Sequence, residues 1–451
     1  MQQTGQSGEA ACEDLIYAPT FWRGADACAC LQDRHFPVTL IERFRPSQVL
    51  RTRDHVAWVL LQQVAVRSLL LVKFLLAARM LGPQLFGVLG VAFTALTIVE
   101  ALSDTGLAQA LVQRREAATS RELGGVWTLQ IFRGLLAGLG MWACAPLIAS
   151  AFGIPESAPL VALAALVPLM RNVLNPGYML LQRSRDFRAI ALTESSVLLM
   201  DAALGLSLLA AGMGPEAILV GSFAGDALRA LVSWTWFRKP IVPHVRWREI
   251  SGLGRFGFWI WGTSALAVLL NQFDKLVVAR WLGPVQFGLY QTSSRLAQLG
   301  IVDLASAAGN YLFPTLSRLH HSDPAAGRRY FYKALALVGG ITGVLALGIA
   351  VFAPFLLSSA LGPQWLPAAP VLRALCVAMW FGALIAVCVA YLRARGLPNT
   401  IVYAVIIQFV VLLLISYPAA THAGAVGMAA ATALAGLVSL VYMFSRARSH
   451  G

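Results

Sequence analysis

Charged residues are scarce in this chain, and their scarcity excludes an ordinary soluble domain. Only 12% of the 451 residues are charged, 58% are hydrophobic, and the mean hydropathy is +0.69. Soluble domains carry about 25% charged residues and roughly 45–50% apolar ones. A spanning helix needs roughly 20 apolar residues, and the short alternating strands of a closed barrel are absent. We therefore expect an all-α polytopic membrane protein.

Cysteine is also sparse, and the six cysteines do not form a disulfide framework. Three lie within apolar runs, where cysteine is most simply a small core residue: Cys144, Cys376 and Cys388. The other three precede the first apolar run: Cys12, Cys28 and Cys30. Together with His35 they are a candidate metal cluster, but Cys-x-Cys is not the usual zinc spacing. We therefore expect no metal site.

Several catalytic motifs are missing as well. The sequence has no GxxxxGK[ST] phosphate loop, no HExxH metal pair and no GxSxG nucleophile turn. We therefore expect neither an enzyme nor a bound cofactor, and transport without an ATPase of its own is the activity that remains. Whether Na⁺ or H⁺ acts as a coupling cation stays open.

A ten-residue motif occurs twice and organises the chain. Residues 78–87 read ARMLGPQLFG, and residues 279–288 read ARWLGPVQFG, 201 positions later. Each copy ends one apolar run and begins the next, which predicts two related helical bundles that meet around a central cavity. The motif residues expected at the outer gate are Arg79, Gly82, Pro83, Arg280, Gly283 and Pro284.

Apolar runs separated by turn formers predict about twelve transmembrane helices. Their approximate bounds are 56–78, 86–112, 123–151, 157–181, 189–211, 216–237, 256–279, 287–313, 331–358, 367–391, 400–420 and 424–445. The predicted breaks are Gly82-Pro83, Gly153-Ile154-Pro155, Gly214-Pro215, Gly283-Pro284, Gly362-Pro363 and Pro418.

The distribution of Lys and Arg predicts the orientation in the membrane. Alternate loops and the two tails carry 25 basic residues, whereas the opposite loops carry two, Arg79 and Arg280. Cytosolic loops hold the excess of Lys and Arg, so we expect both termini in the cytosol. The net charge of +14 then reflects topology, and we expect no nucleic-acid partner.

The same pattern predicts five segments. They are a cytosolic tail (1–54), an N-terminal six-helix bundle (55–238), a cytosolic linker (239–254), a C-terminal six-helix bundle (255–446) and a short cytosolic tail (447–451). The first tail has no apolar run of signal-peptide length. We expect it to be disordered or to form a short amphipathic helix on the membrane surface.

Fifteen charged residues remain inside the predicted spans. They are Arg67, Lys73, Arg133, Arg171, Arg229, Lys275, Arg295, Arg373, Glu100, Asp104, Glu194, Asp201, Asp226, Asp274 and Asp303. A charge near the bilayer centre costs roughly 2.5–3.5 kcal/mol on insertion scales, so these groups must face one another or water. We expect a hydrated cavity whose lining or substrate-binding residues are Arg67, Lys73, Arg133, Arg171, Asn172, Asn175, Asp274, Lys275, Arg295 and Arg373.

The repeat aligns Lys73 with Asp274, because the two positions are 201 residues apart. Each lies six residues before an outer-loop arginine, roughly 9 Å below the outer mouth at 1.5 Å rise per residue. One hypothesis is that Lys73 and Asp274 face each other across the cavity and close its outer end. The alternative is that each charge pairs locally within its own bundle, for instance Lys275 with a carbonyl of a neighbouring helix.

Polar residues interrupt the fourth predicted span at Arg171, Asn172, Asn175 and Pro176. Pro176 frees a backbone carbonyl, and a discontinuous helix is tolerated only where protein or water satisfies it. This favours a cavity-lining helix over a buried structural kink. Three further arginines are expected to line the same space: Arg133, Arg295 and Arg373.

In two cases, a pair of charged residues lies on the same predicted helix. Asp226 and Arg229 are three residues apart and are expected to neutralise each other. Glu194 and Asp201 are seven residues apart and share a helix face. They are candidate ligands for a coupling cation, unless Glu194, near the cytosolic end, is only solvated.

Five segments carry a family resemblance. They are ARMLGPQLFG with SDTGLAQALVQR (Ser103 to Arg114), NQFDKLVVARWLGPVQFGLYQTSSRLAQ (Asn271 to Gln298), YLFPTLSRLH (Tyr311 to His320) and LGPQWLPAAPVLRAL (Leu361 to Leu375). The chain resembles the bacterial lipid-linked oligosaccharide flippases for O-antigen and exopolysaccharide, in the multidrug/oligosaccharidyl-lipid/polysaccharide exporter superfamily. The resemblance covers about residues 55–446 and does not explain the 1–54 tail.

The resemblance implies two six-helix bundles in a V-shaped molecule around a central cavity. It implies a transporter of the bacterial cytoplasmic (inner) membrane that flips polyprenyl pyrophosphate-linked oligosaccharides by alternating access, for O-antigen, exopolysaccharide or capsule synthesis. Besides this substrate and membrane lipid, a polysaccharide polymerase and co-polymerase are the expected partners. Arginines suit phosphates and acidic sugars better than cationic drugs, which agrees with this function.

Three other functions compete with a flippase. A drug/cation antiporter of the same superfamily would need acidic residues to dominate the N-terminal bundle, but Lys73, Arg133 and Arg171 lie there too. A membrane enzyme such as a repeat-unit polymerase or a lipid-linked glycosyltransferase would need a substantial outer loop, which the sequence lacks. A non-catalytic subunit of a polysaccharide assembly complex would hold its buried charges for structural reasons alone.

Overall fold

The computed structural model describes residues 52–104, 120–184, 187–236 and 247–449. These residues are almost entirely helical and contain no strand, so the predicted all-α fold is confirmed for the described part of the chain. The predictions for the 1–54 tail, with Cys12, Cys28, Cys30 and His35, lie outside the described residues, apart from the first residues of α2. Contacts divide the chain into two compact units, Met1–Val56 and Ala57–Gly451, and both predicted bundles belong to the second.

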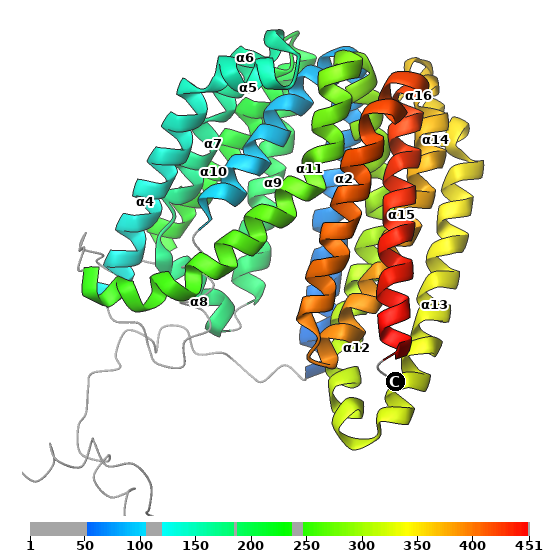
Figure 1. The fold of residues 1–451 in the computed structure, drawn as a ribbon. Helices are drawn as coiled ribbons and strands as arrows, with labels where there is room; N and C mark the ends of the chain where they lie inside the picture. The colour runs from blue at the N-terminus through cyan, green and yellow to red at the C-terminus, as the bar shows by residue number, and fades with distance from the viewer. Residues whose placement is uncertain (1–51, 105–119, 185–186, 237–246, 450–451) are drawn as a thin grey trace, which may run out of the picture. The chain divides into compact units, whose positions relative to one another are not determined.

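The described helices before the linker make up what we call the N-terminal half (Figure 1). They are α2 (Thr52–Ser103), α4 (Ser120–Ala143), α5 (Ala145–Ala151), η4 (Pro155–Ser157), α6 (Ala158–Ala164), α7 (Leu166–Asn172), α8 (Pro176–Ser184), α9 (Phe187–Ala210) and α10 (Glu216–Trp236). α10 packs against α6, α7 and α9, and α4 packs against α6, α7 and α8.

The helices after residue 246 make up the C-terminal half. They are α11 (Trp247–Ala297), the π-helical turn η5 (Gln298–Val302), α12 (Asp303–Ser322), α13 (Pro324–Val351), α14 (Ala353–Ala360), η6 (Pro363–Ala368), α15 (Ala369–Ala394) and α16 (Pro398–Ser449). α13, α15 and α16 run side by side (Figure 1), and α15 packs against α12, α13 and α16.

Three long helices turn sharply at a glycine with positive φ. The turns lie at Gly82 in α2 (φ 72°), Gly283 in α11 (φ 79°) and Gly424 in α16 (φ 60°). L-residues with a side chain rarely adopt this conformation, which explains glycine at each turn. Each helix therefore consists of two arms, and the two copies of the sequence motif form the turns of α2 and α11. The break predicted at Pro418 is displaced, because the chain turns six residues later and Pro418 lies inside the first arm.

Six described helices are long and apolar enough to cross a membrane when each turned helix is counted once. They are Val66–Ser103, Ala189–Ala210, Glu216–Trp236, Ala325–Val351, Pro363–Ala394 and Pro398–Arg448. α4 and α5, bent by 64° at their junction, qualify together as a seventh. The predicted spans overlap these helices, their arms or the shorter helices between them, so twelve spans are compatible with the described residues.

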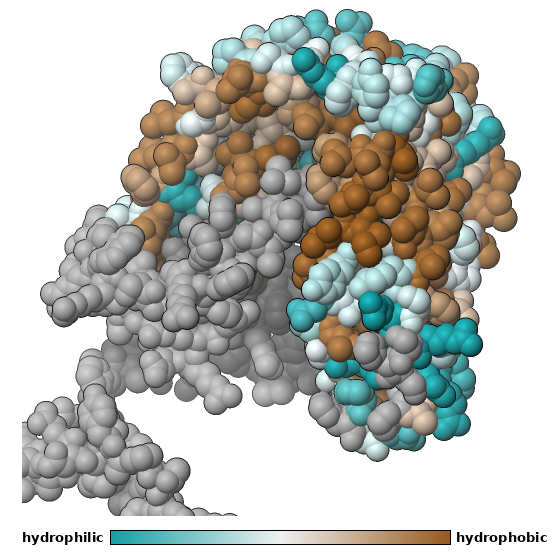
Figure 2. All heavy atoms as spheres, in the orientation of Figure 1, coloured by the Kyte–Doolittle hydropathy of each residue, from teal (hydrophilic) through white to brown (hydrophobic). Residues whose placement is uncertain are grey.

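The outer surface of the helices is apolar where a lipid-facing surface is expected. Leu337, Val344 and Leu347 of α13 are exposed, whereas Leu372 and Leu375 of α15 are fully buried among the other helices. Figure 2 shows hydrophobic residues covering the middle of the C-terminal half, between hydrophilic residues at its two ends. Such an apolar band suits a bilayer core about 30 Å thick.

Two of the three cysteines predicted to be small core residues are buried in the helix packing. Cys376 and Cys388 lie inside α15 and are buried. The prediction for Cys144 is wrong, because this residue is exposed. Its position at the bend between α4 and α5 explains the exposure, since the two helices diverge there.

Candidate functional site

The fourth predicted span is broken where the sequence predicted a discontinuity. α7 ends at Asn172 and α8 begins at Pro176. α10 satisfies the backbone groups that the break releases: the indole N–H of Trp234 donates to the carbonyl of Val173 (2.8 Å), and the Ser233 hydroxyl accepts from the backbone N–H of Asn175 (3.1 Å). The break is thus held against α10 by side chains rather than left to water.

The two asparagines at the break have structural partners. The Asn172 amide donates to the carbonyl of Pro168 (2.7 Å), and the Asn175 side-chain oxygen accepts from the backbone N–H of Gly177 (2.8 Å). Both asparagines are buried. Their polar atoms stabilise the break, and a cavity-lining role for the two asparagines stays a prediction.

Arg171, at the end of α7, joins three helices. Its terminal NH1 donates to both carboxylate oxygens of Glu100 on α2 (2.7 and 2.8 Å), and its Nε donates to Asp226 on α10 (2.8 Å). The Asp226 side chain is 5% exposed, whereas that of Arg171 is 40% exposed. An arginine so exposed within an apolar helix requires an aqueous or anionic neighbour.

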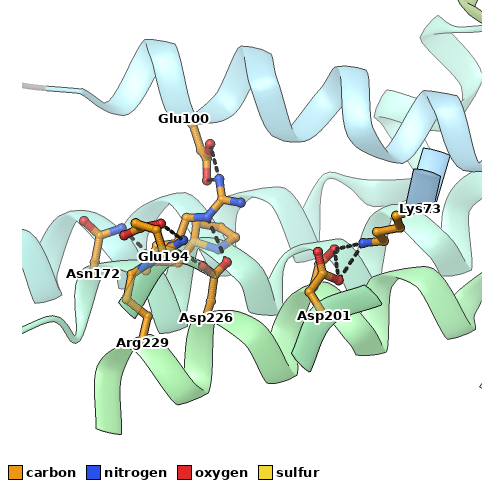
Figure 3. Close-up of polar contacts among 10 residues, drawn as sticks. Lys73, Glu100, Asn172, Glu194, Asp201, Asp226 and Arg229 are labelled. Carbon is orange, nitrogen blue, oxygen red and sulfur yellow. Dashed lines mark hydrogen bonds and ion pairs between the residues drawn. The ribbon is translucent and has the colours of Figure 1, made fainter. Parts of the chain in front are cut away.

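Arg229 extends this cluster along α10. It donates to Asp226 (2.5 Å) and to Glu194 of α9 (2.9 Å), and Glu194 also accepts from the Tyr178 hydroxyl (2.8 Å). The predicted neutralisation of Asp226 by Arg229 is confirmed. Glu194 is neither a free cation ligand nor merely solvated. We call Glu100, Arg171, Tyr178, Glu194, Asp226 and Arg229 the carboxylate–arginine network, and Figure 3 shows its carboxylates converging.

Lys73 forms a second, separate pair further along the same half (Figure 3). Its ammonium donates to Asp201 of α9 (2.5 Å) and lies 3.4 Å from the Ser222 hydroxyl, and both charged side chains are nearly buried, 11% and 12% exposed. The hypothesis that Lys73 faces Asp274 is therefore wrong in this structure, and for Lys73 the alternative of a pair within its own bundle is confirmed. A residue 128 positions away in the chain neutralises this lysine.

The C-terminal half leaves its deep cations without a carboxylate among the described residues. Asp274 accepts from the Tyr290 hydroxyl through one oxygen (2.8 Å), and its other oxygen has no hydrogen-bond partner. Lys275 donates to Gln272 on its own helix (2.8 Å), not to a neighbouring helix carbonyl as suggested. Its charged neighbours are Asp274, of opposite sign, and Arg295, which is exposed and of like sign.

The remaining predicted cavity arginines lie in different places. Arg133 pairs with Asp104 (3.0 Å) within the N-terminal half. Arg373 is exposed and donates to the carbonyl of Ala350 at the end of α13 (3.1 Å). Arg67 pairs with Asp303 of the other half (2.7 Å). The structure thus separates Arg373 from the other candidates and brings Lys275 close to Arg295.

The two copies of the sequence motif meet at one end of the molecule, which we call the Gly-Pro end. A Cβ atom added at Gly87 would overlap the carbonyl of Pro284, and one added at Gly288 would overlap the carbonyl of Pro83. Gly288 is the repeat equivalent of Gly87, and Pro284 is that of Pro83. The motif therefore packs against its own copy in a reciprocal manner, and the close backbone approach explains both glycines.

Side chains outside the motif complete this contact. The indole of Trp365 donates to the carbonyl of Ala78 (3.2 Å), and the Gln364 amide donates to the carbonyl of Arg79 (2.9 Å). The Trp365 ring is fully buried and packs edge-on against Phe86. The sequence alone predicts no role for Gln364 and Trp365, although their place after the Gly362-Pro363 break is a usable signal.

The described residues contain no group of three or more His, Cys, Asp or Glu side chains arranged to hold a metal ion.

Comparison with known proteins decides the family. A family model described as polysaccharide biosynthesis protein matches residues 76–370 of the chain. The chain belongs to this family. It is 27% identical over 331 residues to the lipopolysaccharide biosynthesis protein WzxC of Escherichia coli K12, covering 72% of this chain and 66% of that protein. It is 26% identical over 350 residues to the succinoglycan biosynthesis transport protein ExoT of Rhizobium meliloti, covering 76% and 69%.

Solved structures confirm the fold of this family member. The lipid II flippase MurJ, in an inward closed conformation, superimposes with a TM-score of 0.69 over 86% of this chain and 87% of that one. An inward-facing multidrug resistance MATE transporter of the MOP superfamily superimposes with a TM-score of 0.63 over 84% and 94%. Both are 16% identical to this chain, so they show a shared fold and not a shared substrate. The chain spans about two thirds of the length of WzxC and ExoT.

Proposed function

We propose that this protein flips polyprenyl pyrophosphate-linked oligosaccharides across the bacterial cytoplasmic membrane by alternating access, for the synthesis of an extracellular or surface polysaccharide. Family membership supports the polysaccharide pathway, and the shared fold supports a transporter with two helical halves. The names of the relatives, a lipopolysaccharide biosynthesis protein and a succinoglycan transport protein, agree with a saccharide substrate.

One observation carries the choice of substrate. Lys275 and Arg295 lie 8 residues before and 12 residues after the turn at Gly283, which places them about 12 and 18 Å below the Gly-Pro end at 1.5 Å per residue. Arg295 repels Lys275, Asp274 attracts it electrostatically, and no described carboxylate forms an ion pair with either basic group. Two like charges at this depth are stabilised by water or by an anion. The pyrophosphate of a lipid-linked saccharide supplies that anion.

The N-terminal half supports the same conclusion against a drug/cation antiporter. An antiporter for cations needs a carboxylate that can accept a cation or a proton. Each of the five acidic residues predicted inside the spans of this half instead has a basic partner: Glu100, Asp104, Glu194, Asp201 and Asp226. An anionic substrate therefore fits the described charges better than a cationic one.

The orientation follows from the positive-inside rule. The described basic residues Arg318, Arg393 and Arg446 lie near the ends of α12, α15 and α16, away from the Gly-Pro end. We therefore assign both termini to the cytosol and the Gly-Pro end to the outer face. Under this assignment the reciprocal contacts of the motif close the outer face in the present conformation. A polysaccharide polymerase and a co-polymerase are the proposed partners, because a flipped repeat unit must next be polymerised.

A flipping assay on charge-neutral variants tests the proposal. Purified protein in proteoliposomes is given a fluorescent polyprenyl pyrophosphate-linked oligosaccharide, and an impermeant quencher reports the fraction that changes leaflet. We expect the double variant Lys275→Gln/Arg295→Gln to lose at least about tenfold in rate, equivalent to about 1.4 kcal/mol of lost binding or barrier stabilisation.

Arg373→Gln is the matched control, because Arg373 is an exposed arginine of the same half whose Nε bonds a helix carbonyl. It should keep a flipping rate close to that of the unchanged protein. Equal losses in the double variant and in the control would contradict an anion site at Lys275 and Arg295. Flipping of a cationic dye instead of the oligosaccharide would favour the antiporter.

A further inference from the structure

The contacts between the two halves are unequally distributed along the molecule. Five side-chain hydrogen bonds join described residues of opposite halves. Four lie at the Gly-Pro end, and they involve Arg79 with Ser359, Arg280 with Ser150, Gln364 with Arg79, and Trp365 with Ala78. The fifth is the bond between Arg67 and Asp303.

Arg67 and Asp303 lie far from the Gly-Pro end. Arg67 is 15 residues before the turn at Gly82 and Asp303 is 20 residues after the turn at Gly283, which corresponds to about 22 and 30 Å along their helices. With a bilayer core about 30 Å thick, this pair belongs to the opposite side of the membrane centre. The other described ion pairs join residues within the N-terminal half, so separating the halves leaves them intact.

An uncommon backbone feature, a π-helical turn, directly precedes Asp303. The turn η5 (Gln298–Val302) is π-helical, and the backbone N–H of Asp303 closes it by donating to the carbonyl of Gln298. A π-turn contains one residue more than an α-helical turn, so it rotates the following side chains relative to those before it, and such turns are frequent at functional sites. Without this extra residue the Asp303 side chain would be rotated about the helix axis and would point away from Arg67.

The pair is also easy to break. Its side chains are 52% and 25% exposed, and an ion pair this accessible to solvent contributes little net stability. The Gly-Pro end, by contrast, has four hydrogen bonds, a buried tryptophan and reciprocal backbone contacts. Among the described residues, separation of the halves on the Arg67 side therefore breaks one weak side-chain interaction, whereas separation at the Gly-Pro end breaks several.

We propose that Arg67 and Asp303 form a latch between the halves that closes the cytosolic entrance of the transporter and opens each time a substrate is admitted. The latch rests on the proposed function for what enters, but its mechanical part, a contact that forms and breaks at the inner end, does not depend on the substrate. Asp303 acts by holding Arg67, so we regard it as a positioning residue rather than a substrate ligand.

The first experiment measures the gap between the halves without any substrate. Spin labels are attached to Trp236→Cys at the end of α10 and Ser322→Cys at the end of α12, in a chain whose native cysteines have been replaced. Both parent residues are exposed and end helices that run away from the Gly-Pro end. Pulsed electron–electron resonance in nanodiscs then gives the distribution of distances.

We expect Asp303→Asn to move the distribution to longer distances, and the double reversal Arg67→Asp/Asp303→Arg to return it to the original one. Asp104→Asn is the matched control, because it removes a similarly exposed ion pair that lies within one half. Its distribution should not change. An unchanged distribution in Asp303→Asn, or a double reversal that stays in the long-distance state, would overturn the latch.

The second experiment asks whether opening is required for transport. Arg67→Cys/Asp303→Cys in the same background is joined by a short, reducible bifunctional methanethiosulfonate, and flipping of the fluorescent lipid-linked oligosaccharide is measured before and after reduction. Arg67→Cys/Leu304→Cys is the control pair, because Leu304 is exposed but follows Asp303 by one residue.

We expect the crosslink at 67 and 303 to form efficiently, to reduce flipping at least about fivefold, and to release it on reduction, a change typical of a coupled conformational step. Full flipping with the crosslink in place would overturn the latch. Absence of flipping in every variant, together with the expected distance changes, would instead contradict the proposed substrate and leave the latch supported.

Discussion

Arg79 and Arg280 make equivalent hydrogen bonds, each to a serine carbonyl of the other half. Arg79 of the N-terminal half donates to the carbonyl of Ser359 in the C-terminal half (3.3 Å), and Arg280 of the C-terminal half donates to the carbonyl of Ser150 in the N-terminal half (2.9 Å). The two arginines occupy equivalent positions of the repeat, 201 residues apart. The duplication in the sequence is therefore preserved as a local two-fold relationship in the structure.

This reciprocity predicts equal effects of equivalent glycine substitutions. Gly87→Ala and Gly288→Ala each place a Cβ atom onto a proline carbonyl of the other half, so each should separate the motifs and weaken the folded state by about 1–3 kcal/mol, as overpacking does. Thermal unfolding in detergent measures the loss. Gly140→Ala is the control, because a Cβ there meets no atom within 4 Å. Markedly unequal losses at Gly87 and Gly288 would contradict the two-fold relationship.

Trp365 is expected to stabilise the Gly-Pro end through its indole N–H as well as its ring. Trp365→Phe keeps much of the buried ring but leaves the carbonyl of Ala78 without this donor, so unfolding should become easier by about 1 kcal/mol. Trp281→Phe serves as the comparison, because Trp281 is half exposed and contacts Tyr417 through its ring. The same loss in both variants would show that the hydrogen bond contributes nothing specific.

The break between α7 and α8 should depend on the donor from Trp234. Trp234→Phe removes the only indole that bonds the carbonyl of Val173 among the described residues, and we expect a loss of about 1–3 kcal/mol in the free energy of unfolding. Trp127 provides a close control: its ring packs edge-on against Trp234, and its own buried N–H has no partner. Trp127→Phe should therefore cost less, and a reversed order would refute this role of Trp234.

Asp226 is the most buried member of the carboxylate–arginine network and holds both of its arginines. Asp226→Asn leaves Arg171 and Arg229 with one carboxylate each, so the loss of the charged hydrogen bonds to Asp226 should lower the free energy of unfolding by about 1.5–3 kcal/mol. Asp104→Asn breaks a more exposed pair and should cost about 0–1 kcal/mol. Denaturation in the same detergent measures the free energy of unfolding of both variants. Similar losses in the two variants would contradict the special role of Asp226.

The buried pair of Lys73 and Asp201 should behave as a unit. Lys73→Met leaves an unpaired carboxylate and should destabilise strongly, whereas Lys73→Met/Asp201→Leu removes both charges and should recover most of the loss. A double-mutant cycle on thermal stability measures the coupling. If the double variant were as unstable as the sum of the two single variants, the two residues would not act together.

The parts of the structure that were predictable depend on local chemistry. The turns of α2 and α11 lie at Gly82-Pro83 and Gly283-Pro284, because glycine and proline impose their conformations without help from the rest of the chain. Proline chemistry predicts a break at Pro418 as well, but the positive φ belongs to Gly424. A proline inside a transmembrane helix is tolerated when neighbours satisfy the freed groups, so proline alone did not locate the turn.

The partners of the buried charges were not predictable in the same way. The repeat suggested Lys73 opposite Asp274, yet Lys73 bonds Asp201, because the packing of α2 on α9 decides which carboxylate lies within reach. Asp303 contacts Arg67 because a π-turn orients its side chain, and no sequence pattern predicts this turn. The sequence thus predicted that charges deep in the membrane need partners. The three-dimensional packing determines which residue becomes the partner of each charge.

The most direct test of the account is the movement of the lipid-linked saccharide itself. Proteoliposomes that contain the unmodified protein and a fluorescent polyprenyl pyrophosphate-linked oligosaccharide are compared with protein-free vesicles, and an impermeant quencher measures the rate at which label reaches the other leaflet. The account predicts a rate well above that of protein-free vesicles and a return to the background rate in Lys275→Gln/Arg295→Gln. Equal rates with and without the protein would contradict it.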